Sequence, residues 1–580
     1  MSSLTRRFLD SSRAIAVWSL IMVFAAASPI GAFAQDGVVA RQAVGTTPVS
    51  AQNPQPSAQT QNPITQPLAL SPEVGHQRVG INPGEVAPLS LQDAITFALQ
   101  NNLDIEQFRQ GVRISQFSLN SLRGVYDIVS SADINFRSQT IPVASLFGGG
   151  GTTASLTNRS VAWNLITNQY IERGGGFWQA EFDNNRTKTS STASTLSTQY
   201  SPALTLSFTQ PLLRNFKIDL NRRLIQIAKK TLDLSDSQFR QRVIEIINQV
   251  QRAYWDLVFA IRNEEIARKS VELTRTQLEN NRKMVEAGTL PPIDLRSAEA
   301  ALESRKGDVI VALQGITTAE NVLKALLIKE SNDKLWNAAI EPSDKPQLSM
   351  QSFKLDDATA LALKNRPELD QIRLQSEQKN LDISYYQNQL KPQVDLYGLY
   401  TNNGLAGAPS ALTGQSVPER FIGGYGQALN NLFSQDFKTY QVGVRLSFPW
   451  RNRTAEGNLG RSLAESRQLD ARQRQVVQGV QIDVRNALQA VEAARLRFEA
   501  AQAGRIAAEA QLKGETEKFR AGLSTTFLVL QRQTDLSVAE GTEVRALTDY
   551  NKALADLQRV TGMTLVSNNL QVTSADDTKK

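Results

Sequence analysis

The chain reads LQDAITFALQN at 91–101 and LDDATALALKN at 355–365, so one short amphipathic pattern occurs twice. A second landmark follows each copy, because Ala287-Gly288 and Ala521-Gly522 each interrupt a long helical pattern. Landmarks repeated in the same order indicate two copies of one structural unit, and such a repeat fixes the architecture. We expect the first unit at 89–340 and the second at 341–564.

Segments with alternating apolar and polar residues lie between the short pattern and the long helix of each unit. Such alternation over about ten residues is typical of transmembrane β-strands, and a soluble β-sandwich would show it too. The segments are Ile134–Phe136 and Ala203–Phe208 in the first unit, and Val394–Tyr400 and Val442–Phe448 in the second.

The first unit contains an additional candidate hairpin. Residues 161–171 and 177–186 flank Gly174-Gly175-Gly176, which predicts two strands joined by a turn. The second unit is shorter by about this length, so we expect an inserted hairpin at about 161–186, on the outer side. Whether this hairpin joins the wall formed by the other strands is open at the level of sequence.

Each unit ends in a long helical hairpin. Its apolar residues follow a 4-3-4 spacing without a slip, which indicates helices packed side by side as in coiled coils. The turns contain Gly288 and Gly522, and glycine suits the left-handed position that follows a helix. The repeating apolar residues are Phe239, Val243, Ile246, Val250, Ala253, Leu257 and Ala260, and then Val480, Val484, Ala487, Val491, Ala494, Phe498 and Ala501.

Composition excludes several classes of function. The chain has no cysteine and a single histidine, His76, in a Pro/Gln-rich tract. Thiolate metal sites and the usual histidine-based catalysis therefore lack candidates, and we expect no enzyme, no metal site and no cofactor. The formal charge of +7 is spread along the chain rather than gathered into a patch, which argues against nucleic-acid binding.

The ends of the chain carry features of export and disorder. Basic Arg6 and Arg7, an apolar run and the small-residue site Ala32-Phe33-Ala34 predict a signal peptide over 1–34. We expect a Pro/Gln-rich disordered extension over 35–88 and a disordered tail over 565–580.

Several short motifs together carry a family resemblance. They are the Leu-x-Leu-x-Asp-Ala motif at 89–94, Gln210-Pro211-Leu212-Leu213, its variant Phe448-Pro449-Trp450, and the two hairpin turns. In this order, twice along 89–564, they resemble the TolC family of outer-membrane efflux proteins.

The resemblance implies a mainly α fold with membrane β-structure. Each subunit of a homotrimer would give four strands to a shared twelve-stranded β-barrel, which continues into a long periplasmic α-helical barrel. Such a protein is an exit duct of a tripartite efflux or type I secretion system in the outer membrane of a Gram-negative bacterium. Its partners would be outer-membrane lipid, a periplasmic adaptor (membrane fusion protein) and an inner-membrane pump.

The resemblance also implies a constriction at the helical tips. Asp294 matches an acidic position after the first tip, although a carboxylate also suits the start of a helix. At the second tip, Leu528 and Gln531 stand where the family archetype has acids, and Ser524 stands where it has an arginine, so an apolar constriction at Leu528 is an alternative. The residues expected to contact the adaptor are Gly288, Thr289, Leu290, Gly522, Leu523 and Ser524, and the glycines would suit a plain turn equally well.

A periplasmic coiled-coil scaffold or adaptor protein is the alternative interpretation. It would explain the heptad spacing of the helices. It would leave the alternating segments, and their position at one end of each helical hairpin, without an explanation.

Overall fold

The structure is a computed structural model that describes residues 78–82, 84–144, 148–151, 154–348, 354–411 and 416–572. The predicted signal peptide, most of the predicted extension and the last residues of the tail lie outside the described residues. All described residues belong to one compact unit, Glu73–Lys580.

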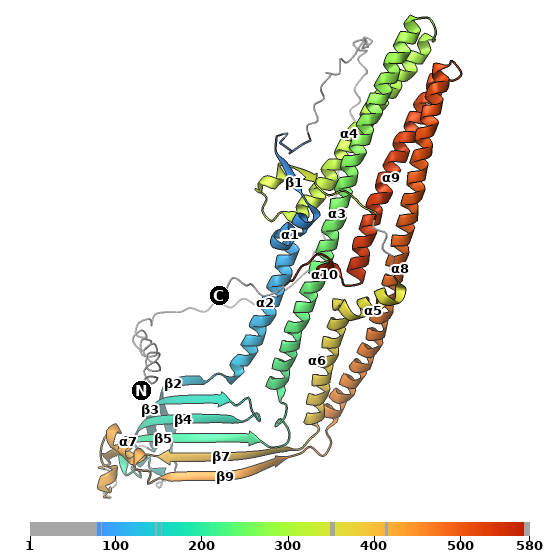
Figure 1. Ribbon diagram of the computed structural model, residues 1–580. Coiled ribbons are helices and arrows are strands. Elements are labelled where there is room, and N and C mark those ends of the chain that lie inside the picture. Colours follow the sequence, from blue (N-terminus) through green and yellow to red (C-terminus); the bar gives the residue numbers. More distant parts are fainter. Residues whose placement is uncertain are drawn as a thin grey trace, which may run out of the picture. The chain divides into compact units, whose positions relative to one another are not determined.

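Helices of matching lengths in the two units confirm the repeat. Each unit has a short helix followed by a medium one, then two longer helices that form a hairpin (Figure 1). Each of the longest helices, with 67 and 68 residues, is about 100 Å long at 1.5 Å per residue. In the first unit the helices are α1 Leu91–Asn101, α2 Leu103–Arg123, α3 Leu220–Glu286 and α4 Pro292–Leu327; in the second they are α5 Leu355–Asn365, α6 Pro367–Gln389, α8 Arg453–Arg520 and α9 Thr526–Val560, with short α7 Tyr425–Phe433 and α10 Thr564–Ser567.

The helices form a slab that is four helices wide. α2 and α4 both pack on α3, at different heights along it, while α6 and α9 pack between α3 and α8. α2 and α4 therefore form one edge of the slab, and α8 forms the other. Among the described helices, only α4 is long and apolar enough by length and composition to cross a membrane, and here it is the return arm of a hairpin packed on α3.

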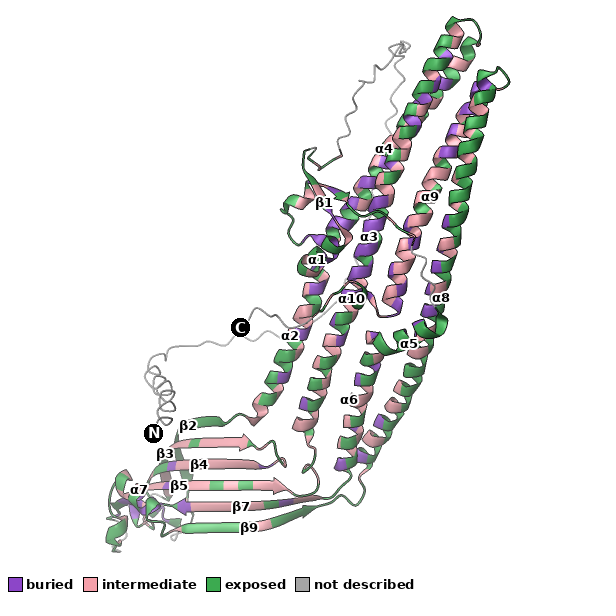
Figure 2. Ribbon diagram, viewed as in Figure 1, coloured by how far each residue is buried: buried purple, intermediate pink, exposed green. Residues whose placement is uncertain are grey.

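The predicted heptad residues form the core between these helices. Phe239, Val243, Ile246, Val250 and Leu257 of α3 are almost fully buried, and they contact the apolar face of α1. Val480 to Ala494 of α8 form a second cluster with residues of α9. Figure 2 shows the buried stripe along α3.

The predicted disorder was wrong at the inner boundary of the extension. β1 Val86–Leu89 pairs in parallel with β6 Ala339–Pro342, and Arg78 forms an ion pair with Glu320 of α4. Lys324, which is 0% exposed, forms a second ion pair with the carboxylate of Glu320. Its ammonium group also donates to the carbonyl oxygens of Trp336 and Ala338 at 2.9 and 2.7 Å. Backbone pairing and a satisfied buried charge offset the entropy of ordering this segment.

The predicted tail is also ordered at its start. α10 occupies Thr564–Ser567, and Leu565, Leu570 and Val572 pack against the core cluster of the first unit. Burial of these apolar side chains explains why the chain stays on the helices up to residue 572.

A single antiparallel sheet lies at the end of the helices opposite the hairpin turns (Figure 1). The strand order is β2-β3-β4-β5-β7-β9, so six long strands stand side by side where the sequence predicted four per chain. The strands are β2 Val129–Pro142, β3 Ser155–Tyr170, β4 Phe177–Thr189, β5 Leu196–Pro211, β7 Gln393–Asn403 and β9 Lys438–Ser447, with short β8 Ala406–Pro409 paired to β5.

The additional hairpin is present about where the sequence placed it, as β3 and β4, and it lies inside the sheet between β2 and β5, a point that the sequence left open. The predicted outer side was wrong, because the turn of the hairpin is at the helical end (Figure 1). Gly174 and Gly175 have φ angles of 80° and 69° in this turn, and the amide of Gln210 donates to the carbonyl oxygen of Gly174 at 2.8 Å. The turn thus rests on the junction between β5 and α3.

We expect Gly175→Ala to lower the free energy of unfolding by about 1–3 kcal/mol, because the residue has a left-handed backbone and no room for a side chain. A Cβ at this position would lie 2.8 Å from the carbonyl oxygen of Asn215. Urea unfolding of the detergent-solubilised protein measures the change. Gly398→Ala is the matched control, since nothing lies within 4 Å of a Cβ there, and equal midpoints for the two variants would contradict the expectation.

Candidate channel wall and helical tips

The first tip joins α3 to α4 by a tight turn. Gly288, at φ 72°, follows the last residues of α3, and its N–H donates to the carbonyl oxygen of Val285 at 3.0 Å. The N–H of Thr289 donates to Met284 at 2.9 Å, which completes a Schellman-type cap. Pro292 is the first residue of α4, where a missing N–H costs nothing.

The second tip repeats this geometry. Gly522 has φ 73°, and the N–H of Leu523 donates to the carbonyl oxygen of Lys518 at 2.8 Å. The hydroxyl of Ser524 donates to the carboxylate of Glu515, and this hydrogen bond lowers the pKa of Glu515. Ser524 is therefore held within its own hairpin rather than reaching the first tip.

The two tips lie at the same end of the slab (Figure 1). They expose apolar side chains. Leu523 is 79% exposed and Phe527 is 69% exposed, and Leu528 is also exposed on the first turn of α9. Gln531 donates to Asp535 at 3.1 Å, and Asp294 lies in the first turn of α4. In the described part of the chain, no hydrogen bond or ion pair joins Asp294 to Leu528 or Gln531.

Links between the two units lie below the tips, and sequence analysis missed them. Arg305 of α4 donates to the hydroxyl of Thr534 in α9, and Lys269 of α3 pairs with Glu540 of α9 at 2.7 Å. Asp256 pairs with Lys552 at 2.6 Å further from the tips. Heptad spacing gives each helix a buried side but not its register against a helix of the other unit, so no sequence signal identifies these partners.

The buried seam of α3 changes from apolar to polar toward the tip. Beyond Val271 the buried residues include Thr274, Gln277 and Asn281, and the amide of Gln277 donates to Asn281 at 2.8 Å. Polar side chains supply far less hydrophobic stabilisation than the Ile and Val residues nearer the sheet. The tip end of α3 thus gains less from apolar burial than its middle part does.

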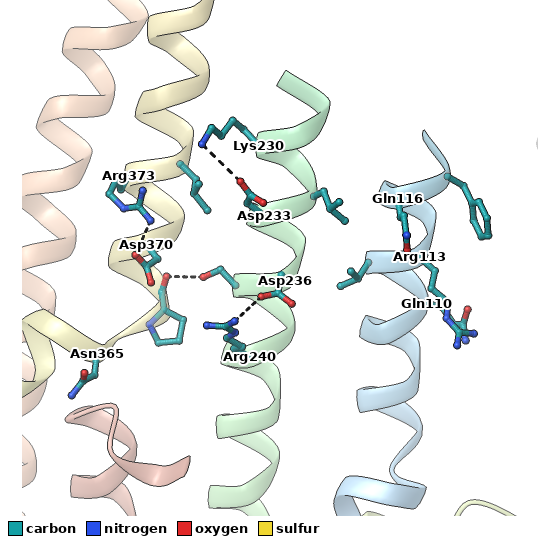
Figure 3. A pocket seen from close by; sticks show the side chains of 16 residues that line it. Gln110, Arg113, Gln116, Lys230, Asp233, Asp236, Arg240, Asn365, Asp370 and Arg373 are labelled. Atoms are coloured by element: carbon teal, nitrogen blue, oxygen red, sulfur yellow. Dashed lines mark hydrogen bonds and ion pairs between the residues drawn. The ribbon is translucent and has the colours of Figure 1, made fainter. Parts of the chain in front are cut away.

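A groove with a volume of about 1060 Å³ lies between α2, α3 and α6 (Figure 3). Several of its charged side chains are paired with one another, as in Arg240–Asp236 and Arg373–Asp370, both at 3.1 Å. No group of three or more potential metal-binding side chains occurs in the described ranges. The groove is accordingly a space between diverging helices, and ion pairs between its lining side chains balance much of its charge.

The sheet has two chemically different faces. Directly paired residues of antiparallel strands share a face, so the registers assign every side chain. The apolar face carries Ala132, Ile134, Phe136, Val161, Trp163, Leu165, Trp178, Ala180, Phe182, Leu204, Leu206, Phe208, Val394, Leu396, Tyr400, Tyr440, Val442, Val444 and Leu446. The opposite face carries mostly polar residues, among them Asp133, Asn135, Asn164, Gln179, Glu181, Asp183, Thr205, Ser207, Thr401 and Gln441.

A sheet with one apolar and one polar face, continued by long helical hairpins, matches a known family. Residues 179–327 and 359–563, more than half of the chain, match the outer membrane efflux protein family. The chain belongs to the outer membrane efflux protein family. This membership identifies an outer-membrane efflux channel and disfavours the scaffold alternative, and the family is one of channels rather than enzymes.

Solved structures show the same fold. A membrane protein from Pseudomonas aeruginosa aligns with a TM-score of 0.59 and 16% identity, over 81% of this chain and 90% of that chain. The CmeC outer membrane channel of Campylobacter jejuni aligns with a TM-score of 0.58 and 15% identity, over 82% of this chain and 86% of that chain. The open state of the MtrE outer membrane channel of Neisseria gonorrhoeae aligns with a TM-score of 0.55 and 18% identity, over 82% of this chain and 89% of that chain. None of the curated proteins matches the chain in sequence.

We expect Arg305→Ala to loosen the helical tips, because it removes a link between α4 and α9. Loss of this hydrogen bond should lower the free energy of local opening by about 1 kcal/mol, which makes hydrogen exchange about fivefold faster. Hydrogen–deuterium exchange of peptides that cover 280–300 and 525–540 measures the effect. Arg296→Ala is the control, since Arg296 pairs only with Glu299 on the same helix at 2.8 Å; equal exchange in both variants would contradict the expectation.

Proposed function

We propose that the chain assembles as a homotrimer that forms an exit duct across the outer membrane of a Gram-negative bacterium. Its helices lie in the periplasm, and an adaptor and an inner-membrane pump deliver substrates to the tips. The observation that carries the proposal is the open edge on each side of a sheet with one apolar face.

The sheet edges favour assembly of identical chains. β2 and β9 stand at the two ends of the strand order, and apart from the partly covered Gly443 all their residues are exposed (Figure 2). In lipid, an unpaired strand edge leaves backbone N–H and C=O groups without partners. Since neighbouring strands are antiparallel and the number of long strands is even, β2 and β9 run in opposite directions. β9 of one copy can therefore pair with β2 of the next, and a ring of copies has no free edge.

The helical slab supports the same arrangement. Its two edges expose apolar side chains that a solvated helix would not need. A neighbouring copy that covers these edges would also explain why α4 has the hydropathy of a membrane span while it belongs to a helical hairpin. The exposed residues are Phe108, Ile114 and Phe117 of α2, Ile310, Val311 and Val322 of α4, and Ile482, Leu496 and Ile506 of α8.

We propose that the tips form both the constriction and the adaptor contact. Exposed Leu523, beside Gly522, offers an apolar anchor for a partner, and half-buried Leu290 has the corresponding place beside Gly288 and Thr289 at the first tip. Leu528 would narrow the duct by an apolar ring, which hinders ions by excluding water. The proposed constriction residues are Asp294, Ser524, Leu528 and Gln531, and the proposed contact residues are Gly288, Thr289, Leu290, Gly522, Leu523 and Ser524.

Conductance across a planar bilayer, measured after the trimer mass is verified, tests the duct. We expect the unaltered protein to insert and conduct. Leu528→Asp adds three carboxylates to one ring of the trimer, so divalent cations should block it at concentrations at least about tenfold lower, since multivalent cations bind clustered carboxylates. Asp294→Ala is the comparison, and we expect it to weaken any block that the unaltered protein shows.

Two outcomes would contradict the proposal in different ways. A monomer or dimer that is soluble without detergent and never conducts would favour a periplasmic scaffold. A conducting trimer whose cation block is unchanged in Leu528→Asp would show that the constriction lies elsewhere.

A further inference from the structure

We propose that the hairpin β3–β4 is part of the transmembrane wall, so that the assembled pore has eighteen strands and a lumen wider than a twelve-stranded one. The inference rests on the proposed trimer, to which each chain would give six strands instead of four. The eighteen-stranded pore should let solutes through the outer membrane that are too large for a twelve-stranded pore.

The hydrogen-bonded ladder of the sheet runs through the hairpin without a gap. β2 pairs with β3 from Val129↔Asn168 to Pro142↔Ser155, which is the whole length of β2. β4 pairs with β5 from Phe177↔Thr209 to Lys188↔Thr198. β2 and β5, which would be neighbours in a four-stranded chain, are therefore held two strands apart. A hairpin that stood outside the wall would leave β2 and β5 paired with each other.

The two faces of the hairpin are in phase with those of the flanking strands. Trp163 lies opposite Ile134 of β2, and Phe182 lies opposite Leu204 of β5, so the apolar face continues across the hairpin. Asn164 lies opposite Asp133, and Asp183 opposite Ala203, on the other face. This alternation is what a strand needs when lipid covers one side and water the other. Exceptions include Ile166 on the polar face and Thr167, Gln169 and Asn184 on the apolar face.

The apolar band on the hairpin ends in residue types that suit a membrane interface. On β4 its apolar side chains run from Trp178 to Phe182, which is about 14 Å along the strand, and polar Asn184 and Arg186 follow on the same face. Outer-membrane strands bound their apolar band with aromatic residues at the interfaces. Trp178 bounds the hairpin band at the helical end. Basic Arg159, Arg186 and Lys188 bound it at the other end, where anionic lipid head groups would attract them.

An insertion of two strands is compatible with the rest of the chain. It preserves the direction of β5, which must end at α3, and it preserves the even number of strands that closure requires. The turn of the hairpin also packs closely against the junction between β5 and α3. The carbonyl oxygen of Gly174 accepts a hydrogen bond from Gln210, and a side chain at Gly175 would collide with Asn215. Barrel diameter grows roughly linearly with strand number, so eighteen strands give a diameter about 1.5 times that of twelve.

Single-cysteine labelling tests whether the hairpin lies in the wall, and the chain has no native cysteine to interfere. Asn164→Cys and Asp183→Cys place a thiol on the polar face of the hairpin, and Leu165→Cys and Phe182→Cys place one on the apolar face. In trimers reconstituted into vesicles, we expect a membrane-impermeant maleimide to modify the first pair at least about tenfold faster. A lipid-bound nitroxide should quench a fluorophore only at the second pair. Denatured samples of all four variants should react equally.

Gln441→Cys and Val444→Cys on β9 are the control, because β9 belongs to the wall whether the wall has twelve strands or eighteen. If β9 alternates in reactivity while all four hairpin positions react equally, the eighteen-stranded wall is wrong and the duct stands. If β9 does not alternate either, the proposed membrane duct itself is wrong.

Deletion of 155–189 supplies the test of pore width. It joins the outer-end loops and leaves β2 and β5 to pair, as in a twelve-stranded ring. We expect polymers added from the outer side to enter the full-length pore up to a radius about 1.5 times the limit of the deletion variant. Equal limits in two folded trimers would overturn the wider lumen, and the labelling experiment decides the wall if the deletion variant does not fold.

Discussion

The structure depends on one constraint, which is that every backbone N–H and C=O group in a membrane needs a hydrogen-bonding partner. β2 and β9 do not satisfy it within one chain, since each has a partner strand on one side only. The two-faced sheet, the even number of strands and the exposed apolar edges of the helical slab all follow from a solution in which copies of the chain supply the missing partners. In the proposed trimer the helices inherit their arrangement from the sheet, because β5 and β9 lead directly into α3 and α8.

Much of the fold could be predicted because it depends on local patterns. The heptad residues of α3 are buried as expected, and Gly288 and Gly522 adopt the left-handed angles that the turns require. The hairpin bounds were also visible in the alternation around Gly174. Its neighbours in the sheet were not, since alternation assigns faces to a strand but says nothing of which strand lies beside it. For the same reason the tract before residue 89 concealed β1, whose partner β6 lies about 250 residues further along the chain.

The candidate site was predictable only in part, and the reason is again the range of the interactions. Each tip turn is a local structure, and the sequence located both. Ser524 was expected at a place where the family has a partner between tips, yet its hydroxyl binds Glu515 of its own hairpin. The links that do connect the two units, such as Arg305 with Thr534, depend on the register between α4 and α9. That register is set by the whole slab and not by any segment of it.

Burial is uneven along the helices, and α3 has more buried apolar residues in its middle part than at its tip end. In its middle part, α3 buries large apolar residues such as Ile246 and Leu257, and the fully buried Lys324 of α4 donates to two carbonyl oxygens. Near the tips the same seam buries Thr274 and Asn281, whose burial contributes little because it exchanges bonds with water for bonds within the protein. Exposed ion pairs such as Lys269–Glu540 add at most about 1 kcal/mol each. In the proposed trimer, a force applied by a partner at the tips would therefore act first on the hairpin ends, beyond the apolar middle of α3, and the tip end could change its width while the ring of strands stays closed.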